Sequence, residues 1–233
     1  MPGMQAVRHE LKYTIPYGEY LHLSRTLDYV MMRDPAGDAY NEYAVRSLYF
    51  DTVDDDFLME KISGVGSRQK YRLRIYNFED KLIKLERKAK IGDLIAKDTV
   101  TVPRDLAEQL MAGDPTGLTR TAEPLLRDVY REMRLRLLRP VVIVDYVREA
   151  YLHQAEDVRV TFDKKLHTGL WSTDLFNPFL PTVPAMNPDL VVLEVKFNRV
   201  LPDHIRALIS SVAARRQAVS KYVLCRQFEE KEY

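Results

Sequence analysis

Basic residues alternate with apolar residues in several short segments of the sequence. In the clearest of these segments, Lys70, Arg72 and Arg74 are separated by single apolar residues. Because successive residues of a β-strand point to opposite faces, this spacing predicts a strand with one basic face and one apolar face. Two arginines on the same face present planar groups of donors that suit the oxygen atoms of phosphate. The pattern therefore predicts a phosphate-binding surface.

Glutamates occur among the basic positions. Glu10, Glu86 and Glu194 each lie two residues from a lysine, so each is expected to share a strand face with a cation. Carboxylate oxygens are ligands for hard divalent cations, and lysine and arginine bind phosphate oxygens. Together they are what a metal–phosphate complex requires. An antiparallel sheet with one face in water shows the same alternation, so the pattern leaves both interpretations open.

Hydrophobic periodicity predicts the elements that must position these residues. Strands are predicted over 8–15, 43–52, 68–77, 81–90, 96–102, 141–149, 157–164, 190–198 and 220–227. Helices are predicted over 17–32, 104–112, 123–138 and 202–214. The helices do not alternate one for one with strands, which favours an α+β fold with an antiparallel sheet. The alternation of residues along each strand does not show whether the sheet closes into a barrel with its charged face inward.

Two features lie outside this pattern. Arg46 occupies an otherwise apolar strand face, and we consider both the charged interior and an outer ion pair for it. The segment 167–188 carries four prolines together with Trp171, Phe176 and Phe179. We expect a long surface excursion held in place by its aromatic residues, with a lid or binding loop as the alternative.

The composition restricts the class of protein. The chain has 233 residues, a formal net charge of +1 and one cysteine, Cys225, which excludes an internal disulfide framework and a multi-cysteine metal site. No apolar run approaches the ~20 residues of a membrane span, so we expect a cytoplasmic chain without a span. The near-neutral charge and the lack of a recognition-helix pattern argue against nucleic acid as a partner. No break in composition marks a boundary, which predicts a single domain, 1–233.

A series of motifs, in order, resembles a known family. The motifs are RHELKY (8–13), RSLYFDT (46–52), KYRLRIY (70–76), LERK (85–88), YVR (146–148), RVTFD (159–163), LEVKF (193–197) and SKY (220–222). They resemble the VTC domain, the catalytic domain of the vacuolar transporter chaperone polyphosphate polymerases and their bacterial relatives. That family falls within the triphosphate tunnel metalloenzymes, the CYTH-like superfamily.

The resemblance implies a fold and an activity. The fold is a closed antiparallel β-barrel tunnel of about eight strands with helices packed outside. The activity is that of a polyphosphate polymerase-like phosphotransferase, which moves the γ-phosphate of a nucleoside triphosphate such as ATP onto a polyphosphate chain. The cofactor is Mn²⁺ or Mg²⁺. The implied partners are the nucleoside triphosphate and polyphosphate, and a separate membrane partner remains open.

The resemblance also assigns residues. Phosphates are held by Lys12, Arg72, Arg74, Lys88, Lys97, Arg148, Arg159 and Lys221. The catalytic set is Arg72, Arg74, Lys88 and Glu194. Glu194 is the implied metal ligand, with Glu10 and Glu86 as assisting carboxylates.

One departure from the wider superfamily bears on the activity. Related tunnel phosphatases begin with Glu-x-Glu-x-Lys, whereas this chain has Arg8 at the first position and therefore lacks one expected carboxylate. This difference argues against a simple triphosphatase. Two alternatives stay open: a tunnel triphosphatase that hydrolyses inorganic or organic triphosphates, and a non-catalytic module that binds polyphosphate.

Overall fold

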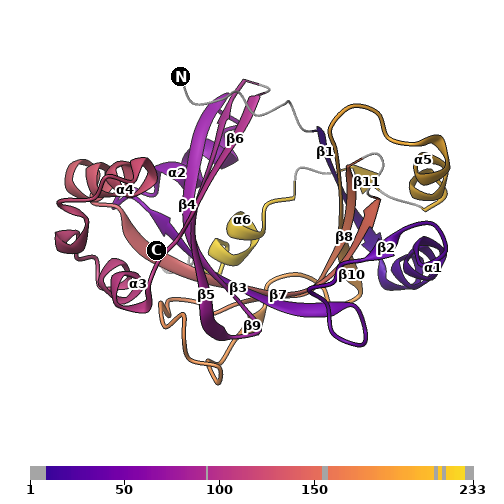
Figure 1. The fold of residues 1–233 in the computed structure, drawn as a ribbon, viewed down its shortest axis with the longest axis horizontal. Coiled ribbons are helices and arrows are strands. Elements are labelled where there is room, and N and C mark those ends of the chain that lie inside the picture. The colour runs from indigo at the N-terminus through magenta and orange to yellow at the C-terminus, as the bar shows by residue number, and fades with distance from the viewer. Residues whose placement is uncertain (1–8, 93, 154–156, 213–214, 217–218, 229–233) are drawn as a thin grey trace. The chain divides into compact units, whose positions relative to one another are not determined.

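The computed structural model describes residues 9–92, 94–153, 157–212, 215–216 and 219–228 (Figure 1). The chain divides into two units, each assembled from three separate stretches of sequence. The first unit comprises 1–44, 146–166 and 186–220, and the second comprises 45–145, 167–185 and 221–233. Arg8, the start of the first predicted strand, lies outside the described residues.

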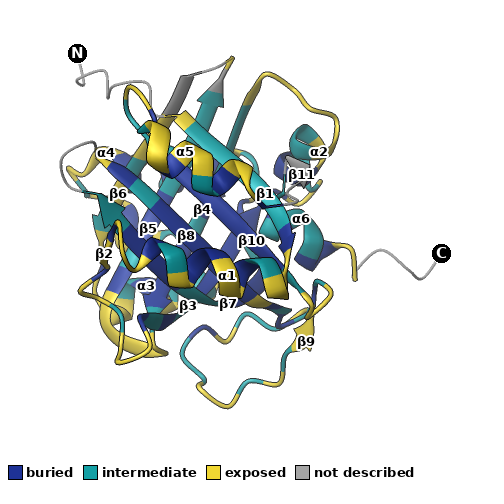
Figure 2. Cartoon of the chain, turned by 90° about the vertical axis from the view of Figure 1, so that its right-hand side faces the viewer, coloured by how far each residue is buried: buried dark blue, intermediate teal, exposed yellow. Residues whose placement is uncertain are grey.

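The first unit packs two helices on one face of antiparallel strands. Its elements are β1 (His9–Pro16), α1 (Tyr17–Leu27), β2 (Met32–Arg33), β8 (Val158–Thr168), β10 (Leu190–Phe197), α5 (Asp203–Ser210) and β11 (Arg215–Arg216). The strand order is β11-β1-β10-β8-β7, and β2 pairs with the end of β7 (Arg139–His153). Leu23, Leu27, Phe162, Leu193 and Ile205 are buried in one core cluster. Figure 2 shows α1 and α5 lying across these strands, with exposed residues on their outward sides.

The second unit contains the remaining strands and helices, including the part of β7 before residue 146. Its elements are β3 (Glu42–Asp51), α2 (Asp56–Ile62), β4 (Ser67–Tyr76), β5 (Glu79–Ile91), β6 (Leu94–Thr101), α3 (Arg104–Met111), the 3₁₀ helix Thr116–Leu118, α4 (Pro124–Leu135), β9 (Val183–Pro184) and α6 (Lys221–Arg226). The strand order is β7-β3-β4-β5-β6, and β9 pairs with the end of β8. A separate core contains Leu73, Leu85, Leu110, Val129 and Ile143.

The alternation predicted for residues 70–75 is confirmed. Tyr71, Leu73 and Ile75 are fully buried in the core of the second unit, and the basic residues between them therefore point to the other face of β4. The strands predicted over 68–77 and 81–90 form a hairpin. Asn77 and Phe78 both have positive φ, and they join β4 to β5 in antiparallel pairing.

The α+β antiparallel fold class is confirmed, whereas a closed barrel is not. The strand order has two ends, β11 and β6, and no pairing of the described residues joins them. Within the same described ranges, no helix is long and apolar enough to span a membrane.

The predicted last strand, 220–227, is wrong, because Lys221–Arg226 forms helix α6. Tyr222, Cys225 and Arg226 are all buried, at the spacing of three and four residues that one helix face requires. The strand propensity of a Tyr-Val pair is weak compared with this packing. Several predicted helices also end earlier than expected, since α1 ends at Leu27, α4 at Leu135 and α5 at Ser210.

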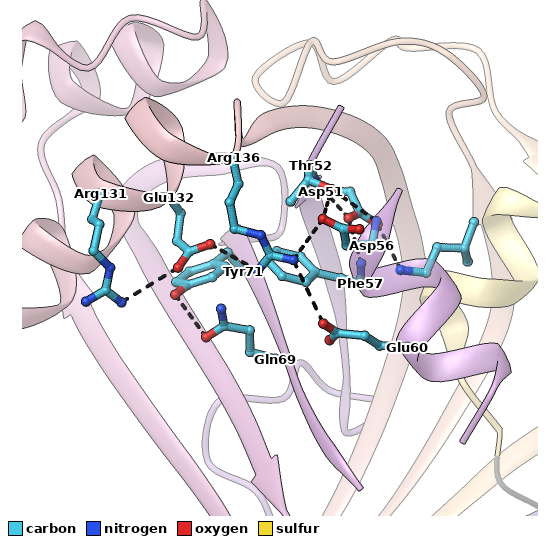
Figure 3. Close-up of polar contacts among 11 residues, drawn as sticks. Asp51, Thr52, Asp56, Phe57, Glu60, Gln69, Tyr71, Arg131, Glu132 and Arg136 are labelled. Atoms are coloured by element: carbon cyan, nitrogen blue, oxygen red, sulfur yellow. Dashed lines mark hydrogen bonds and ion pairs between the residues drawn. The ribbon is translucent and has the colours of Figure 1, made fainter. Parts of the chain in front are cut away.

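Helix α2 was not predicted, because the groups that cap it come from the preceding strand. The carboxylate of Asp51 accepts hydrogen bonds from the backbone N–H groups of Phe57 and Leu58, at 2.9 and 3.0 Å. Asp51 also accepts a hydrogen bond from the hydroxyl of Tyr222 on α6. Arg136, just after α4, lies 2.8 Å from Asp56 (Figure 3). The start of α2 thus depends on tertiary contacts as well as on local sequence.

Arg46 forms an outer ion pair. Its Nη2 lies 2.7 Å from a carboxylate oxygen of Asp145, and its side chain is 2% exposed. Leu48 and Phe50, on the same face of β3, belong to the core of the second unit. Of the two roles considered for Arg46, the structure therefore selects the ion pair on the core side of the strand.

The 167–188 segment is held by fewer aromatic residues than expected. Leu175 is fully buried, and Phe176 packs against the same core with the Arg104 guanidinium 4.5 Å from its ring centroid. In contrast, Trp171 and Phe179 are 70% and 89% exposed. The anchoring part of the segment is therefore the pair Leu175–Phe176.

Replacing Asp51 with alanine is expected to lower the free energy of unfolding by about 3 kcal/mol, because buried donors of α2 and Tyr222 lose their acceptor. Denaturant unfolding of Asp51→Ala measures the loss. The matched control is Asp54→Ala, which removes an exposed carboxylate three residues away. Equal stability losses in the two variants would contradict this role for Asp51.

Candidate functional site

The strands β4, β5 and β6 place a group of charged side chains on the face opposite the core of the second unit. We call this group the basic face. Its members are Lys70, Arg72, Arg74, Lys84, Glu86, Lys88 and Lys97. Lys88 pairs directly with Lys70 on one side and with Lys97 on the other, and Arg72 pairs with Glu86. Six of these side chains are cationic and one is a carboxylate, so the group attracts anions.

Glu86 is the counter-ion within the basic face. Its Oε2 lies 2.6 Å from Nη2 of Arg72 and 3.6 Å from Nη1 of Arg74, and its Oε1 lies 2.5 Å from Nζ of Lys97. Burial alone raises the pKa of Glu86, but Arg72, Arg74 and Lys97 outweigh it and hold that pKa well below its usual value. A metal ion at Glu86 has to compete with three cations, so this carboxylate suits charge balance better than metal binding.

Hydrogen bonds to β3 orient the two arginines. Arg74, which is 6% exposed, donates from Nε to the hydroxyl of Ser47 at 3.1 Å. Arg72 donates from Nη1 to the hydroxyl of Tyr49 at 2.8 Å, while its Nε donates to Glu86 at 2.7 Å. Arg72 is therefore held from two sides. Sequence reasoning did not single out Tyr49, although the residue lies in the 46–52 motif at the same parity as Ser47.

The charge of the basic face perturbs Tyr49 itself. Burial works to raise the pKa of this phenol, but Arg72, Lys70 and Arg74 outweigh it and lower the pKa to about 7. Nearby cations stabilise the ionised form of an acid. The shift therefore reports a strongly positive environment in the place where the sequence predicts phosphate binding.

Helix α6 lies on the same side of β3 as the basic face. The ring of Tyr222 stacks on that of Tyr49, with centroids 5.1 Å apart and an angle of 23° between the planes. Lys221 is the first residue of this helix and directly precedes Tyr222 in the chain. Lys221 was expected on a strand, and the structure places it on a helix instead.

The first unit carries a different group, which we call the mixed face. Its members on β1, β7, β8 and β10 are Glu10, Lys12, Arg148, Arg159, Asp163, Glu194 and Lys196. Strand register places Lys12 opposite Glu194 and Glu10 opposite Lys196. The Nζ of Lys12 lies 2.6 Å from Glu10 and 3.8 Å from Glu194, and Lys196 forms an ion pair with Glu194. Acidic and basic groups thus alternate across the two strands.

The two lysines of the mixed face respond differently to this environment. Burial works to lower the pKa of Lys12, but the attraction of Glu194 and Glu10 outweighs it and the pKa is raised. Burial lowers the pKa of Lys196 to about 8, against the attraction of Glu194 and Glu10. Of these two lysines, Lys196 is therefore the one that loses its proton at the lower pH.

Glu10 and Glu194 fit a divalent cation better than Glu86 does. Both approach the same ammonium group of Lys12 within 4 Å. Thr161 pairs with Glu194 on the neighbouring strand, and its buried hydroxyl has no hydrogen-bond partner in the described part of the chain. No group of three or more His, Cys, Asp or Glu side chains among the described residues could hold a metal ion. A magnesium-type ion commonly uses one or two carboxylates together with oxygens of the substrate phosphates. Glu10 and Glu194 can supply the two carboxylates.

The two remaining predicted arginines are bound to carboxylates. Arg148 donates to both oxygens of Asp163, at 2.7 and 2.9 Å. Arg159 donates from Nη2 to Asp34 at 2.7 Å and to the hydroxyl of Tyr43 at 3.0 Å. Asp163 alternates with Arg159 on the same strand face, whereas Asp34 lies far away in sequence with no pattern to mark it.

These arrangements define a class of protein. The antiparallel sheet with its helices and charged strand faces fits the α+β triphosphate tunnel fold, as similar solved structures show. A structure of a candidate adenylyl cyclase from Hippeastrum, with a dominant triphosphatase activity, is similar with a TM-score of 0.58 at 14% identity, over 94% of this chain and 95% of that one. A candidate adenylate cyclase from Bacillus halodurans is similar with a TM-score of 0.51 at 11% identity, over 88% and 86% of the two chains.

The chain belongs to the VTC domain family, whose match covers residues 7–228. The family resemblance seen in the ordered motifs is therefore confirmed. At 14% and 11% identity, the solved structures support the fold alone. A search of curated proteins finds no match.

Replacing Glu86 with glutamine is expected to change how stability depends on pH. The folded-state pKa of Glu86 is lowered, so its ionised form contributes stability above the unfolded value of 4.5, and this contribution is lost as the pH falls through the acid range. The wild type should therefore lose stability more steeply below about pH 4.5 than Glu86→Gln. At neutral pH the variant should be less stable by about 3 kcal/mol.

Denaturant unfolding at several pH values measures both effects. Glu79→Gln is the control, because Glu79 is half exposed and pairs with the exposed Lys81. Parallel pH profiles for the wild type and Glu86→Gln would show that Glu86 is not the counter-ion of the arginines.

Proposed function

We propose that this VTC domain is a metal-dependent phosphotransferase that extends polyphosphate with the γ-phosphate of a nucleoside triphosphate of the ATP type, acting as a single domain over 1–233. The observation that carries the proposal is the basic face, in which Arg72 and Arg74 are held in fixed positions among further lysines. Cations so arranged bind successive phosphate groups without contacts to a particular base or sugar. Both the triphosphate and the growing chain offer such groups.

The basic face has the parts needed to stabilise phosphoryl transfer. The transition state of this reaction is loose, with charge spread over the oxygens of the transferred group, so positioning and electrostatic stabilisation supply most of the rate. Arg72, Arg74 and Lys88 are assigned this task, and Lys97 and Lys221 are assigned to further phosphates. Arg72 and Arg74 need little reorganisation, because Glu86, Tyr49 and Ser47 already fix their guanidinium groups.

The mixed face is assigned the divalent cation. Glu194, assisted by Glu10, would hold Mn²⁺ or Mg²⁺, and the bound ion would neutralise phosphate charge as a Lewis acid. Lys12, which contacts both carboxylates, can turn to phosphate oxygens when a cation takes its place. Arg148 and Arg159 are assigned to phosphates on the same face. They remain aligned by Asp163 and Asp34.

The proposed step requires no side-chain nucleophile. A terminal oxygen of polyphosphate attacks the γ-phosphorus, a new P–O–P bond forms, and the bond between the β–γ bridging oxygen and the γ-phosphorus breaks. The nucleoside diphosphate leaves with that bridging oxygen, and charge and atoms balance without a further reactant. The acceptor oxygen is already ionised at neutral pH, so the protein has only to bind and orient the reacting groups.

A triphosphatase is the second candidate, and one observation favours it. The Hippeastrum protein with the similar fold has a dominant triphosphatase activity. In that reaction water replaces the polyphosphate oxygen as the attacking group. Arg8, in place of the first glutamate of the tunnel phosphatase motif, argues for chain transfer instead. A module that binds polyphosphate without turnover is the third candidate.

Incubation of the purified chain with ATP and Mn²⁺ separates the three candidates. A polymerase should produce long polyphosphate, visible by gel electrophoresis. It should also release one nucleoside diphosphate for each phosphate that it adds to the chain. A hydrolase should release free phosphate with no chains. Tight binding of polyphosphate without any product would contradict both enzymatic proposals.

Two variants separate turnover from binding. Glu194→Gln should lower the rate on the order of 100-fold while leaving tripolyphosphate binding largely intact, because it removes the metal ligand and no phosphate contact. Arg72→Ala combined with Arg74→Ala should instead weaken tripolyphosphate binding on the order of 100-fold. Rates and calorimetric affinities measure the two effects.

Matched controls remove the same groups from exposed sites. Glu79→Gln and Arg104→Ala change side chains that are about half exposed and are assigned to neither face. Full activity in Glu194→Gln would exclude the metal assignment. Unchanged affinity in the double arginine variant would exclude the basic face as the phosphate site.

A further inference from the structure

We propose that Tyr49 is an internal counter-anion of the basic face, ionised above neutral pH in the absence of phosphate and protonated when phosphate binds. The proposal rests on the proposed function only in requiring that phosphate bind this face. It gives Tyr49 two tasks: to position Arg72, and to couple phosphate binding to the uptake of one proton.

The surroundings of Tyr49 favour a negative charge on its oxygen. Its hydroxyl accepts the hydrogen bond from Nη1 of Arg72 at 2.8 Å. From β4, the ammonium of Lys70 lies 5.9 Å from the Tyr49 ring centroid, and Arg74 adds a further positive charge. Tyr49 is 4% exposed, so water screens these charges little. The lowered pKa of Tyr49, about 7, agrees with this geometry.

The stacked partner on α6 has the opposite environment. Tyr222 donates its hydroxyl hydrogen to the carboxylate of Asp51, and burial and that negative charge raise its pKa. Arg226, one helical turn on, donates to the Tyr222 hydroxyl at 3.2 Å and does not reverse this shift. Two tyrosines in ring contact thus differ in proton affinity, with Tyr49 the acid that ionises first.

Phosphate binding offsets the positive charge that stabilises the phenolate of Tyr49. Lys70, Arg72 and Arg74 attract the phenolate, but a phosphate bound to these side chains brings its own negative charge close to the oxygen. The pKa of Tyr49 then rises, and the phenolate takes one proton from solvent to become the neutral phenol. Below neutral pH the phenol is already protonated and phosphate binds at no such cost. Above neutral pH, binding weakens because a proton must also be taken up.

Positioning follows from the same hydrogen bond. Glu86 accepts from Nε of Arg72 and Tyr49 accepts from Nη1, so the guanidinium plane is held at two points. Phenylalanine at position 49 keeps the ring that stacks on Tyr222 but removes one of these points. Tyr49→Phe should therefore weaken tripolyphosphate binding below neutral pH, where the charge of the phenol plays no part.

The test is ultraviolet absorption of the tyrosinate band as a function of pH, recorded for the full chain and for Tyr49→Phe. The difference between the two should show one tyrosine that ionises near pH 7. Saturating tripolyphosphate should move this midpoint upward by about one pH unit or more. Tyr222→Phe is the matched control, because it should leave the titration near pH 7 in place. Circular dichroism establishes that both variants are folded.

Calorimetric affinities for tripolyphosphate between pH 6 and 9 complete the test. Because the probe's own titration is common to all variants, the ratio of wild-type to Tyr49→Phe affinity isolates the contribution of Tyr49, and this ratio should fall as the pH rises. A titration near pH 7 that persists in Tyr49→Phe, or one that tripolyphosphate does not move although it binds, would overturn the inference alone. If tripolyphosphate does not bind the wild type, the proposed function fails with the coupling.

Discussion

The period of two in β-strands is the constraint on which the charged surfaces depend. Tyr71, Leu73 and Ile75 are drawn into the core of the second unit by the hydrophobic effect, so the basic residues between them must share the other face of β4. Hydrogen-bonded pairing to β5 and β6 then brings more lysines beside them. Crowded cations are unfavourable, and Glu86 offsets part of this repulsion. The binding surface is thus a consequence of core formation.

The two units meet this constraint in different ways. The basic face of the second unit keeps an excess of positive charge around Glu86, whereas the mixed face of the first unit alternates acidic and basic groups, as at Lys12 and Glu194. A surface with excess positive charge suits phosphate, and a surface with paired carboxylates and lysines can exchange an ammonium group for a divalent cation. The perturbed groups follow this division. Tyr49 has a lowered pKa on the basic face, and Lys196 has a lowered pKa on the mixed face.

Much of the fold could be predicted from local sequence. The strand at 70–75 and the helix at 124–135 both depend on hydrophobic periodicity within one short segment, which can be read from the sequence directly. The family could be recognised because most of its motifs overlap strands of this kind, although SKY (220–222) lies at the start of α6. Candidate residues such as Arg72, Arg74 and Lys88 were found by parity for the same reason, and register confirms that they share one face. Their roles remain proposals.

What residue order by itself determined is therefore the sorting of side chains to two faces of each strand and the class of chemistry that those faces allow. Tertiary structure alone decided which charges meet. Asp145 neutralises Arg46, Asp34 holds Arg159, and Asp51 caps α2 while binding α6. Each partner lies on another segment of the chain or in another element, so no spacing rule reports it. The closeness of three cations to one buried phenol is likewise a property of the packed structure, because electrostatic energy depends on distance and burial rather than on position in sequence.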